Sequence, residues 1–136
     1  MSENLSGIRV LIIDDSNTIR RSAEVYLVND GEKQPTGIVV KAVEGPFEAF
    51  GCMVEFNPDV IFLDVSMPKL DGFDACKVIR GNADMGAVPI VMLTSKDTTF
   101  DQARAQMAGA SDYVTKPFTR DTILAAVRKH RPKTAA

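Results

Sequence analysis

Short apolar runs alternate with longer amphipathic stretches along most of this chain, and this alternation is the strongest constraint on its fold. The runs of strand length stand at residues 8–13, 38–43, 60–63 and 89–93, with a weaker one at 113–114. They are continuous, as is typical of strands buried on both faces, and strands that alternate with helices build parallel sheets. We therefore expect an α/β fold, a doubly wound five-stranded parallel sheet with five helices.

The expected helices have recognisable ends and apolar faces. Ser16 is a candidate N-cap for the first helix, and Pro46 suits the first turn of the second, which Asn57 would end. Gly109 can end a later helix, and Thr119 opens the last one. The positions that we predict to face the core are Ile19, Ala23 and Leu27, then Phe47, Phe50 and Val54, then Phe100, Ala103 and Met107, and finally Ile123, Leu124 and Val127.

Length and composition match one soluble globular domain. The chain has 136 residues, 45% of them hydrophobic and 25% charged, and no apolar stretch approaches the roughly 18 residues that a membrane span needs. We expect a flexible segment at 1–7, one domain at 8–131 and a short tail at 132–136, too few residues for an output domain. The polar start lacks the features of a secretory signal and so indicates the cytoplasm.

Charge and cysteine content argue against two other classes of protein. A net charge of −2 offers no basic field for nucleic acid, and the positive run from Arg128 to Lys133 is typical of a helix end. Cys52 and Cys76 each lie in an expected helix without a partner motif. This pattern favours small buried hydrophobic residues over a disulfide or a metal site.

Polar residues follow the apolar runs at the edge where open α/β sheets bind their ligands, the carboxyl ends of the strands. Asp14 and Asp15 follow the first run, Asp64 the third, Thr94 the fourth and Lys116 the fifth. If the first and third strands are neighbours, three carboxylates meet there. Two unit charges about 4 Å apart repel by about 4 kcal/mol at an effective dielectric near 20, so the cluster needs a cation or a proton.

A magnesium ion would satisfy this cluster, because magnesium binds through one or two carboxylates together with water and phosphate oxygens. With three carboxylates, Mg²⁺ and Lys116 the formal charges cancel, and such a pocket can accept a phosphoryl group. Each residue alone also has an ordinary interpretation: Asp15 as a helix cap, Asp64 as a turn residue, Thr94 as a strand residue and Lys116 as a surface charge. Their convergence from separate strands favours the functional interpretation.

The motifs around these residues resemble those of bacterial response-regulator receiver domains, along residues 8–130. LIIDDS at 11–16 resembles the acidic opening of the family, PDVIFLD at 58–64 its phosphoacceptor strand, and MPKLDGF at 67–73 the following loop; PIVMLTS at 89–95 and KPF at 116–118 complete the match. Thr94 lies 30 positions after Asp64, and Lys116 lies 22 after Thr94, both typical spacings. The resemblance implies a flavodoxin-like, CheY-like fold.

The same resemblance implies the chemistry of the site. Asp64 would accept a phosphoryl group from a sensor histidine kinase, assisted by Lys116 and Thr94, and the chain would catalyse only its own phosphoryl transfer and dephosphorylation. The implied magnesium ligands are the side chains of Asp14, Asp15 and Asp64 and the backbone carbonyl of Ser66. The bond between Lys116 and Pro117 is implied to be cis.

The resemblance further implies a switch and a partner. Thr94 would move to the phosphoryl group and Tyr113 would fill the space that it leaves. This would change the surface of the last two helices and the fifth strand, which a downstream effector protein would read. The segments 15–21 and 94–97 look most like single-domain regulators of chemotaxis-type pathways, especially those of type IV pilus twitching motility. The loop from Asn29 to Gly37 is longer than usual in the family, so that edge either contacts a specific partner or is simply mobile.

Other classes of function fit the sequence less well. A magnesium-dependent phosphatase of the haloacid dehalogenase type needs a second aspartate two residues after its nucleophile, where Ser66 stands. A flavin or nucleotide binder needs a glycine-rich loop after the first strand, where acidic residues stand instead. A receiver fold kept only for docking would not need the complete set Asp14, Asp15, Asp64, Thr94 and Lys116.

Overall fold

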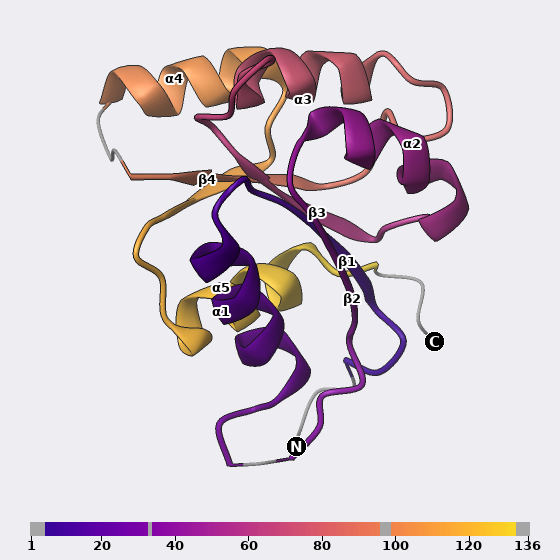
Figure 1. Cartoon of the computed structure of the whole chain (residues 1–136), viewed down its shortest axis with the longest axis vertical. Coiled ribbons are helices and arrows are strands. Elements are labelled where there is room, and N and C mark those ends of the chain that lie inside the picture. Colours follow the sequence, from indigo (N-terminus) through magenta and orange to yellow (C-terminus); the bar gives the residue numbers. More distant parts are fainter. Residues whose placement is uncertain (1–4, 33, 96–98, 133–136) are drawn as a thin grey trace.

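Five parallel strands form one sheet in the order β2-β1-β3-β4-β5, with helices on both faces (Figure 1). The computed structural model describes residues 5–32, 34–95 and 99–132. The strands are β1 (Arg9–Ile13), β2 (Val39–Val43), β3 (Val60–Asp64), β4 (Ile90–Thr94) and β5 (Asp112–Thr115). The helices are α1 (Asn17–Val28), α2 (Pro46–Phe56), α3 (Gly72–Arg80), α4 (Thr99–Ala108) and α5 (Arg120–His130). The predicted doubly wound α/β fold is confirmed.

Helices α1 and α5 cover one face of the sheet, and α2, α3 and α4 cover the other (Figure 1). Successive side chains of a strand point to opposite faces, so each inner strand supplies two cores. In β3, Val60 and Phe62 belong to the core under α1 and α5, whereas Ile61 and Leu63 belong to the core under the other three helices. Because both sets are fully buried, the strand reads as a continuous apolar run.

The edge strand β2 departs from the expectation of burial on both faces. It pairs with β1 alone, Val39 is 43% exposed and Lys41 is exposed. An edge strand receives less cover than a central one, so the prediction of two buried faces is wrong here. In the loop before β2, Asn29 and Pro35 form an isolated antiparallel bridge.

Helices α1 and α5 follow the sequence prediction. Ser16 Oγ accepts a hydrogen bond from the backbone N–H of Ile19, and Thr119 Oγ1 accepts one from that of Thr122, each at 3.2 Å. Both predicted N-caps are therefore confirmed. The predicted core positions that are buried are Ala23 and Leu27 in α1 and Ile123, Leu124 and Val127 in α5.

The predicted core face of α2 is wrong at Phe47 and Val54, whereas Phe50 packs against the core. Phe47 and Val54 are 56% and 54% exposed, and Phe50 is only partly buried. The buried residues of this helix are Pro46, Ala49 and Met53. Because α2 is apolar on most of its circumference, periodicity alone does not choose the side that packs on the sheet.

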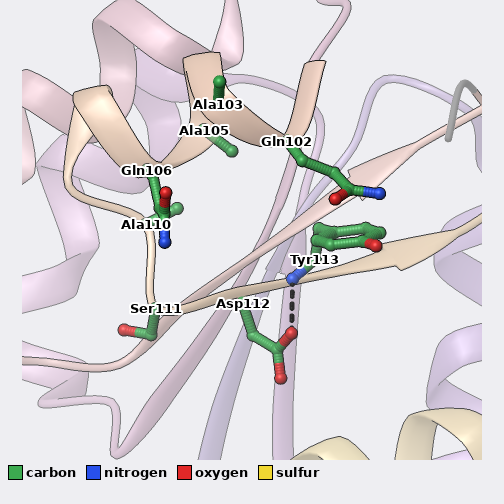
Figure 2. Close-up of a pocket in the computed structure, with 8 residues that line it drawn as sticks. All are labelled: Gln102, Ala103, Ala105, Gln106, Ala110, Ser111, Asp112 and Tyr113. Carbon is green, nitrogen blue, oxygen red and sulfur yellow. Dashed lines mark hydrogen bonds between the residues drawn. The ribbon is translucent and has the colours of Figure 1, made fainter. Parts of the chain in front are cut away.

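The predicted core face of α4 is also wrong. Ala105 points toward the sheet, whereas Ala103 points away from it (Figure 2), and Met107 is 85% exposed. The side chain of Phe100 lies outside the described part of the chain. Small buried side chains, Ala105 and Ala108, let α4 approach the sheet closely, and a pattern read from bulky residues misses such a face.

Both cysteines are free, as expected, with Cys76 buried and Cys52 partly buried. Leu5 packs into the core under α1 and α5, while residues 1–4 of the expected N-terminal segment and residues 133–136 of the expected tail lie outside the described residues. Within the described ranges, no helix is both long and apolar enough to cross a membrane.

Helix α3 begins in close contact with the end of β3. The backbone N–H of Gly72 donates to the carbonyl of Val65 at 2.7 Å. A Cβ added at Gly72 would stand 2.2 Å from the carbonyl oxygen of Asp64. Only glycine permits this approach, so Gly72 keeps the start of α3 against the backbone that carries Asp64.

We expect Gly72→Ala to lower the free energy of unfolding by about 2 kcal/mol or more, because the added Cβ forces the backbone of β3 and α3 apart. Gly51→Ala is the matched control: Gly51 lies inside α2, where an added Cβ meets no atom within 4 Å. That control should gain about 0.5–1 kcal/mol from reduced backbone entropy in the unfolded state. Urea unfolding followed by circular dichroism measures both, and a loss of the same size in both variants would contradict the close approach.

Candidate functional site

The strand order places the candidate residues around one crevice. Strand β1 lies between β2, which follows it in the chain, and β3. The connections that leave β1 and β3 therefore run in opposite directions along the sheet, and a crevice opens between the carboxyl ends of these two strands. Asp14 follows β1 directly, and Asp64 is the last residue of β3. Both are buried, with 0% and 3% of their surface exposed, whereas Asp15 is exposed.

The predicted convergence of three carboxylates is confirmed. One oxygen atom each from Asp14, Asp15 and Asp64 lies within 4.8 Å of the other two. They line a cavity of about 450 Å³, and its lining also includes Ser66, Thr94 and Lys116, which the sequence predicted here, together with Ser95. The parallel sheet thus collects side chains that are far apart in the chain.

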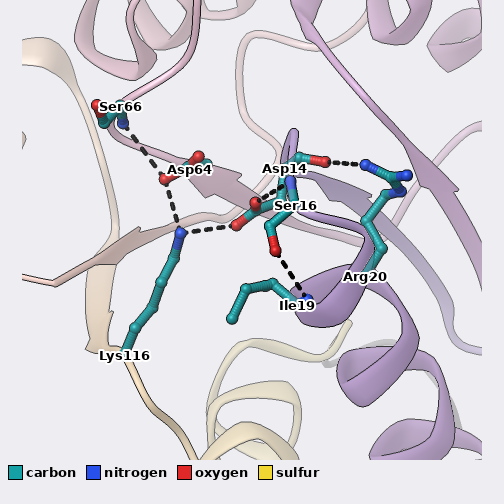
Figure 3. A network of polar contacts seen from close by, with 7 residues as sticks. All are labelled: Asp14, Ser16, Ile19, Arg20, Asp64, Ser66 and Lys116. Carbon is teal, nitrogen blue, oxygen red and sulfur yellow. Dashed lines mark hydrogen bonds and ion pairs between the residues drawn. The ribbon is translucent and has the colours of Figure 1, made fainter.

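Lys116 lies between the two buried carboxylates (Figure 3). Its Nζ is 2.8 Å from Asp14 Oδ2 and 2.9 Å from Asp64 Oδ1. The backbone N–H of Lys116 donates to the carbonyl of Thr94 at 2.7 Å, and the peptide bond to Pro117 is cis, as predicted. The lysine thus supplies one positive charge to the clustered carboxylates.

The turn between β1 and α1 orients Asp14. The backbone N–H of Ser16 donates to Asp14 Oδ1 at 2.9 Å, and Arg20 Nη1 donates to the Asp14 carbonyl at 2.7 Å (Figure 3). Arg20 also contacts the side chain of Asn17 and lies 3.9 Å from Glu44. Arg20 is not predicted as a site residue from the sequence, because one arginine on an amphipathic helix is usually a solvated side chain.

The environment of Asp64 disfavours its charged form. Burial contributes most to raising the pKa of this carboxyl from 3.8 to about 6, and the charge of Asp14 adds to it, although Lys116 and the N–H of Ser66 act in the opposite direction. Burial alone would lower the pKa of Lys116, but the two carboxylates outweigh it and raise that pKa. Lys116 therefore stays charged without fully compensating Asp64, and the cluster can take a further cation.

The donor set fits a hard divalent cation. Asp14 Oδ2 is fully buried, and Lys116 Nζ lies 2.8 Å from it as an ion pair. The three candidate side-chain ligands are all carboxylates, the ligands that Mg²⁺ and Ca²⁺ prefer over softer metals. The cluster is therefore a site that could hold a metal ion, while the role of the Ser66 carbonyl stays a prediction.

Thr94 and Tyr113 also lie together beside the site. Thr94 ends β4 and is 8% exposed, and Tyr113 is partly buried on the neighbouring strand β5. Both line one small cavity, which Gln102 of α4 also lines. The structure thus brings the two residues together, and their function as a switch stays a prediction.

Two charged residues that line the main cavity were not predicted from the sequence, Asp71 and Arg104. Asp71 caps α3 by accepting a hydrogen bond from the N–H of Asp74 at 2.9 Å. Arg104 on α4 lies 3.8 Å from the Asp71 carboxylate. Asp71 lies in the motif at 67–73, which could have pointed to it, whereas Arg104 has no such signal, because only the packing of α4 beside α3 brings it to the cavity.

This fold, with three carboxylates and a lysine at the carboxyl edge of the sheet, is that of a receiver domain. Residues 10–128 match the family described as the response regulator receiver domain. The chain belongs to this family, and the resemblance read from its motifs is confirmed.

Individual relatives agree with this assignment. Protein PilG of Pseudomonas aeruginosa is 39% identical over 132 residues, which cover 97% of this chain and 93% of PilG. The response regulator MprA of Mycobacterium tuberculosis is 33% identical over 134 residues, and this chain spans only 55% of its length. Among solved structures, the chemotaxis protein CheY4 of Vibrio cholerae superposes with a TM-score of 0.81 at 28% identity, covering 90% of this chain and 98% of CheY4.

In metal-free buffer we expect the protein to lose stability as the pH rises from about 4 to about 6. Asp64 has a pKa of about 6 when folded, against an ordinary 3.8. The folded state therefore binds more protons in this window, and the free energy of unfolding falls as pH increases. Asp64→Asn removes the effect, so the variant should exceed the wild type by about 3 kcal/mol at pH 7.5.

Urea unfolding in the presence of a chelator, at pH 7.5 and at pH 3.5, measures this difference. At pH 3.5, below both pKa values, Asp64 is mostly protonated in both states, so the two proteins should then have nearly equal stabilities. An advantage of Asp64→Asn that is the same at both pH values would show that the carboxylate charge is not its cause.

Proposed function

We propose that Asp64 is the phosphoacceptor of this receiver domain and takes its phosphoryl group from a phosphohistidine of a sensor histidine kinase. The observation that carries the proposal is the position of Asp64, held by Lys116 in a carboxylate-lined cavity at the carboxyl end of β3. A carboxylate oxygen attacks phosphorus, the P–N bond to the histidine breaks, and the imidazole leaves as an acyl phosphate forms on Asp64.

The residues around Asp64 assist the transfer mainly through charge. Lys116 neutralises developing charge on the phosphoryl oxygens, and the hydroxyl of Thr94 can donate to one of them. Asp14, Asp15, Asp64 and the Ser66 carbonyl would hold Mg²⁺, which supplies further charge neutralisation when bound. The domain would catalyse only two reactions, the transfer of a phosphoryl group to its own Asp64 and the later hydrolysis of that group.

We further propose that phosphorylation switches a protein-binding surface formed by α4, β5 and α5. A groove of about 300 Å³ lies there, and in it the side chain of Gln102 lies over the ring of Tyr113 (Figure 2). If Thr94 moves toward the phosphoryl group, Tyr113 can follow and reshape this groove. A downstream effector protein would read the change, and no nucleic acid is part of the proposal.

The proposed pathway is chemotaxis-like or twitching-motility signalling, with the chain acting as a single-domain regulator. The motifs at 15–21 and 94–97 support this, as does the likeness to CheY4, which is a chemotaxis protein. The match to PilG over nearly its whole length supports a regulator of this size.

We expect acetyl phosphate with Mg²⁺ to add one phosphoryl group to the wild type and none to Asp64→Asn, because the amide has no nucleophilic oxygen anion. The matched control is Asp84→Asn, which removes an exposed acid in the segment between α3 and β4, away from the cavity. It should be phosphorylated like the wild type. Intact-mass spectrometry reads the result, and equal phosphoryl gain by Asp64→Asn would overturn the assignment.

We expect Asp15→Asn to weaken magnesium binding by about tenfold or more, because it removes one of three clustered carboxylate ligands. Asp15 is exposed, so the variant should keep the wild-type fold. Isothermal titration calorimetry with MgCl₂ measures the affinities, again with Asp84→Asn as the control. Unchanged affinity in Asp15→Asn would remove this residue from the proposed ligand set.

A further inference from the structure

Arg104 links the candidate site to helix α4. It lines the same cavity as Asp64 and Lys116, although it comes from the helix that forms part of the proposed partner surface. Among the described residues, Lys116 and Arg104 are the two basic side chains in the cavity lining. A second cation beside a phosphoacceptor calls for a physical explanation.

The guanidinium of Arg104 is positioned but weakly held. It stacks over the ring of Phe73, 4.3 Å from the centroid, and that ring is almost fully buried. Its charge faces Asp71 at 3.8 Å, but the side chains of Arg104 and Asp71 are 51% and 39% exposed. Long, exposed ion pairs of this kind contribute little to stability, so another anion at the cavity can compete with Asp71.

Phosphorylation of Asp64 would supply such an anion. It adds negative charge and three strong acceptor oxygens to the cavity. The ammonium of Lys116 is already shared between Asp14 and Asp64. A guanidinium can donate two parallel hydrogen bonds to phosphoryl oxygens, an interaction stronger than a long ion pair with an exposed carboxylate.

We propose that Arg104 is the group through which α4 senses the phosphoryl group. In the unphosphorylated protein Asp71 and Phe73 hold its guanidinium at the rim of the cavity. When Asp64 is phosphorylated, the guanidinium leaves Asp71 and binds the phosphoryl oxygens, which draws α4 toward β3 and transmits the change to the surface of α4 and β5. This inference rests on the proposed phosphorylation of Asp64, and it adds the contact through which the phosphoryl group would act on α4.

The test compares the affinity of full-length variants for beryllofluoride, a phosphoryl mimic, in the presence of MgCl₂ by NMR titration. Arg104→Gln should bind about tenfold more weakly, and Arg104→Lys should lose less, because it keeps the charge without the paired donors. Asp71→Asn should bind about threefold more tightly, because it frees Arg104, while asparagine preserves the cap of α3.

Arg128→Gln is the matched control for the lost arginine charge. Arg128 lies in the last turn of α5, and because α5 runs antiparallel to the strands, this turn is at the end of the sheet opposite to the cavity. Its affinity should equal that of the wild type. Thermal unfolding by circular dichroism confirms that each variant is folded before the titration.

The test depends on Arg104→Gln and Asp71→Asn changing the affinity for beryllofluoride in opposite directions. If Arg104→Gln and Asp71→Asn weaken binding alike, the pair is only a structural tie between α3 and α4, and the inference is wrong. If Arg104→Gln leaves the affinity unchanged while Asp64→Asn abolishes binding, the inference fails but the proposed phosphoacceptor stands. If the wild type binds no beryllofluoride, the proposed function fails, and the inference fails with it.

Discussion

The ammonium of Lys116 holds together two buried carboxylates that would otherwise repel each other. Asp14 comes from the end of β1, Asp64 from the end of β3, and Lys116 from the segment after β5. The three meet only if the intervening strands keep their register, with Ile13 beside Leu63 and Thr94 beside Thr115. The site therefore depends on the pairing of the strands from β1 to β5 across the sheet, and the sheet in turn must accommodate a charged cluster that its apolar core does not stabilise.

The two ends of the sheet differ in how they are held. At the amino ends of the strands, polar ties pin the connections: Arg80 donates to the carbonyls of Val88 and Gly109, and Asp112 accepts from Lys129 of α5 at 3.1 Å. At the carboxyl ends lies the cavity of about 450 Å³, lined by side chains with incompletely matched charge. The amino ends of the strands are therefore held by polar contacts, whereas the carboxyl ends keep a cluster of charges that is incompletely neutralised.

Helices α3 and α4 give this crevice its connection to the surface. Gly72 lets α3 start directly against the backbone of Asp64, and Asp71 and Phe73 beside it contact Arg104 of α4. Through Arg104, α4 thus reaches the lining of the same cavity as Asp64. The same helix lines the groove that contains Tyr113, so α4 contributes side chains to both the crevice and the groove.

The strand positions and the carboxylate cluster could be predicted from the sequence, because central parallel strands must be apolar on both faces and must end at a common edge. For that reason the sequence predicts the residues that follow these runs, which are Asp14, Asp64, Thr94 and Lys116. The packed faces of α2 and α4 were not readable, because apolar side chains surround α2 and small alanines line the buried side of α4.

What only the tertiary structure decided are the relations between elements. The exposure of β2 follows from its place at the sheet edge, and the contact of Asp71 with Arg104 follows from the packing of α4 beside α3. The sequence by itself determined the fold class and the residues at the ends of the strands, because local hydrophobic pattern decides which segments are buried. Pairings between surface side chains remain undetermined at that level, since they depend on which helices become neighbours once the sheet has formed.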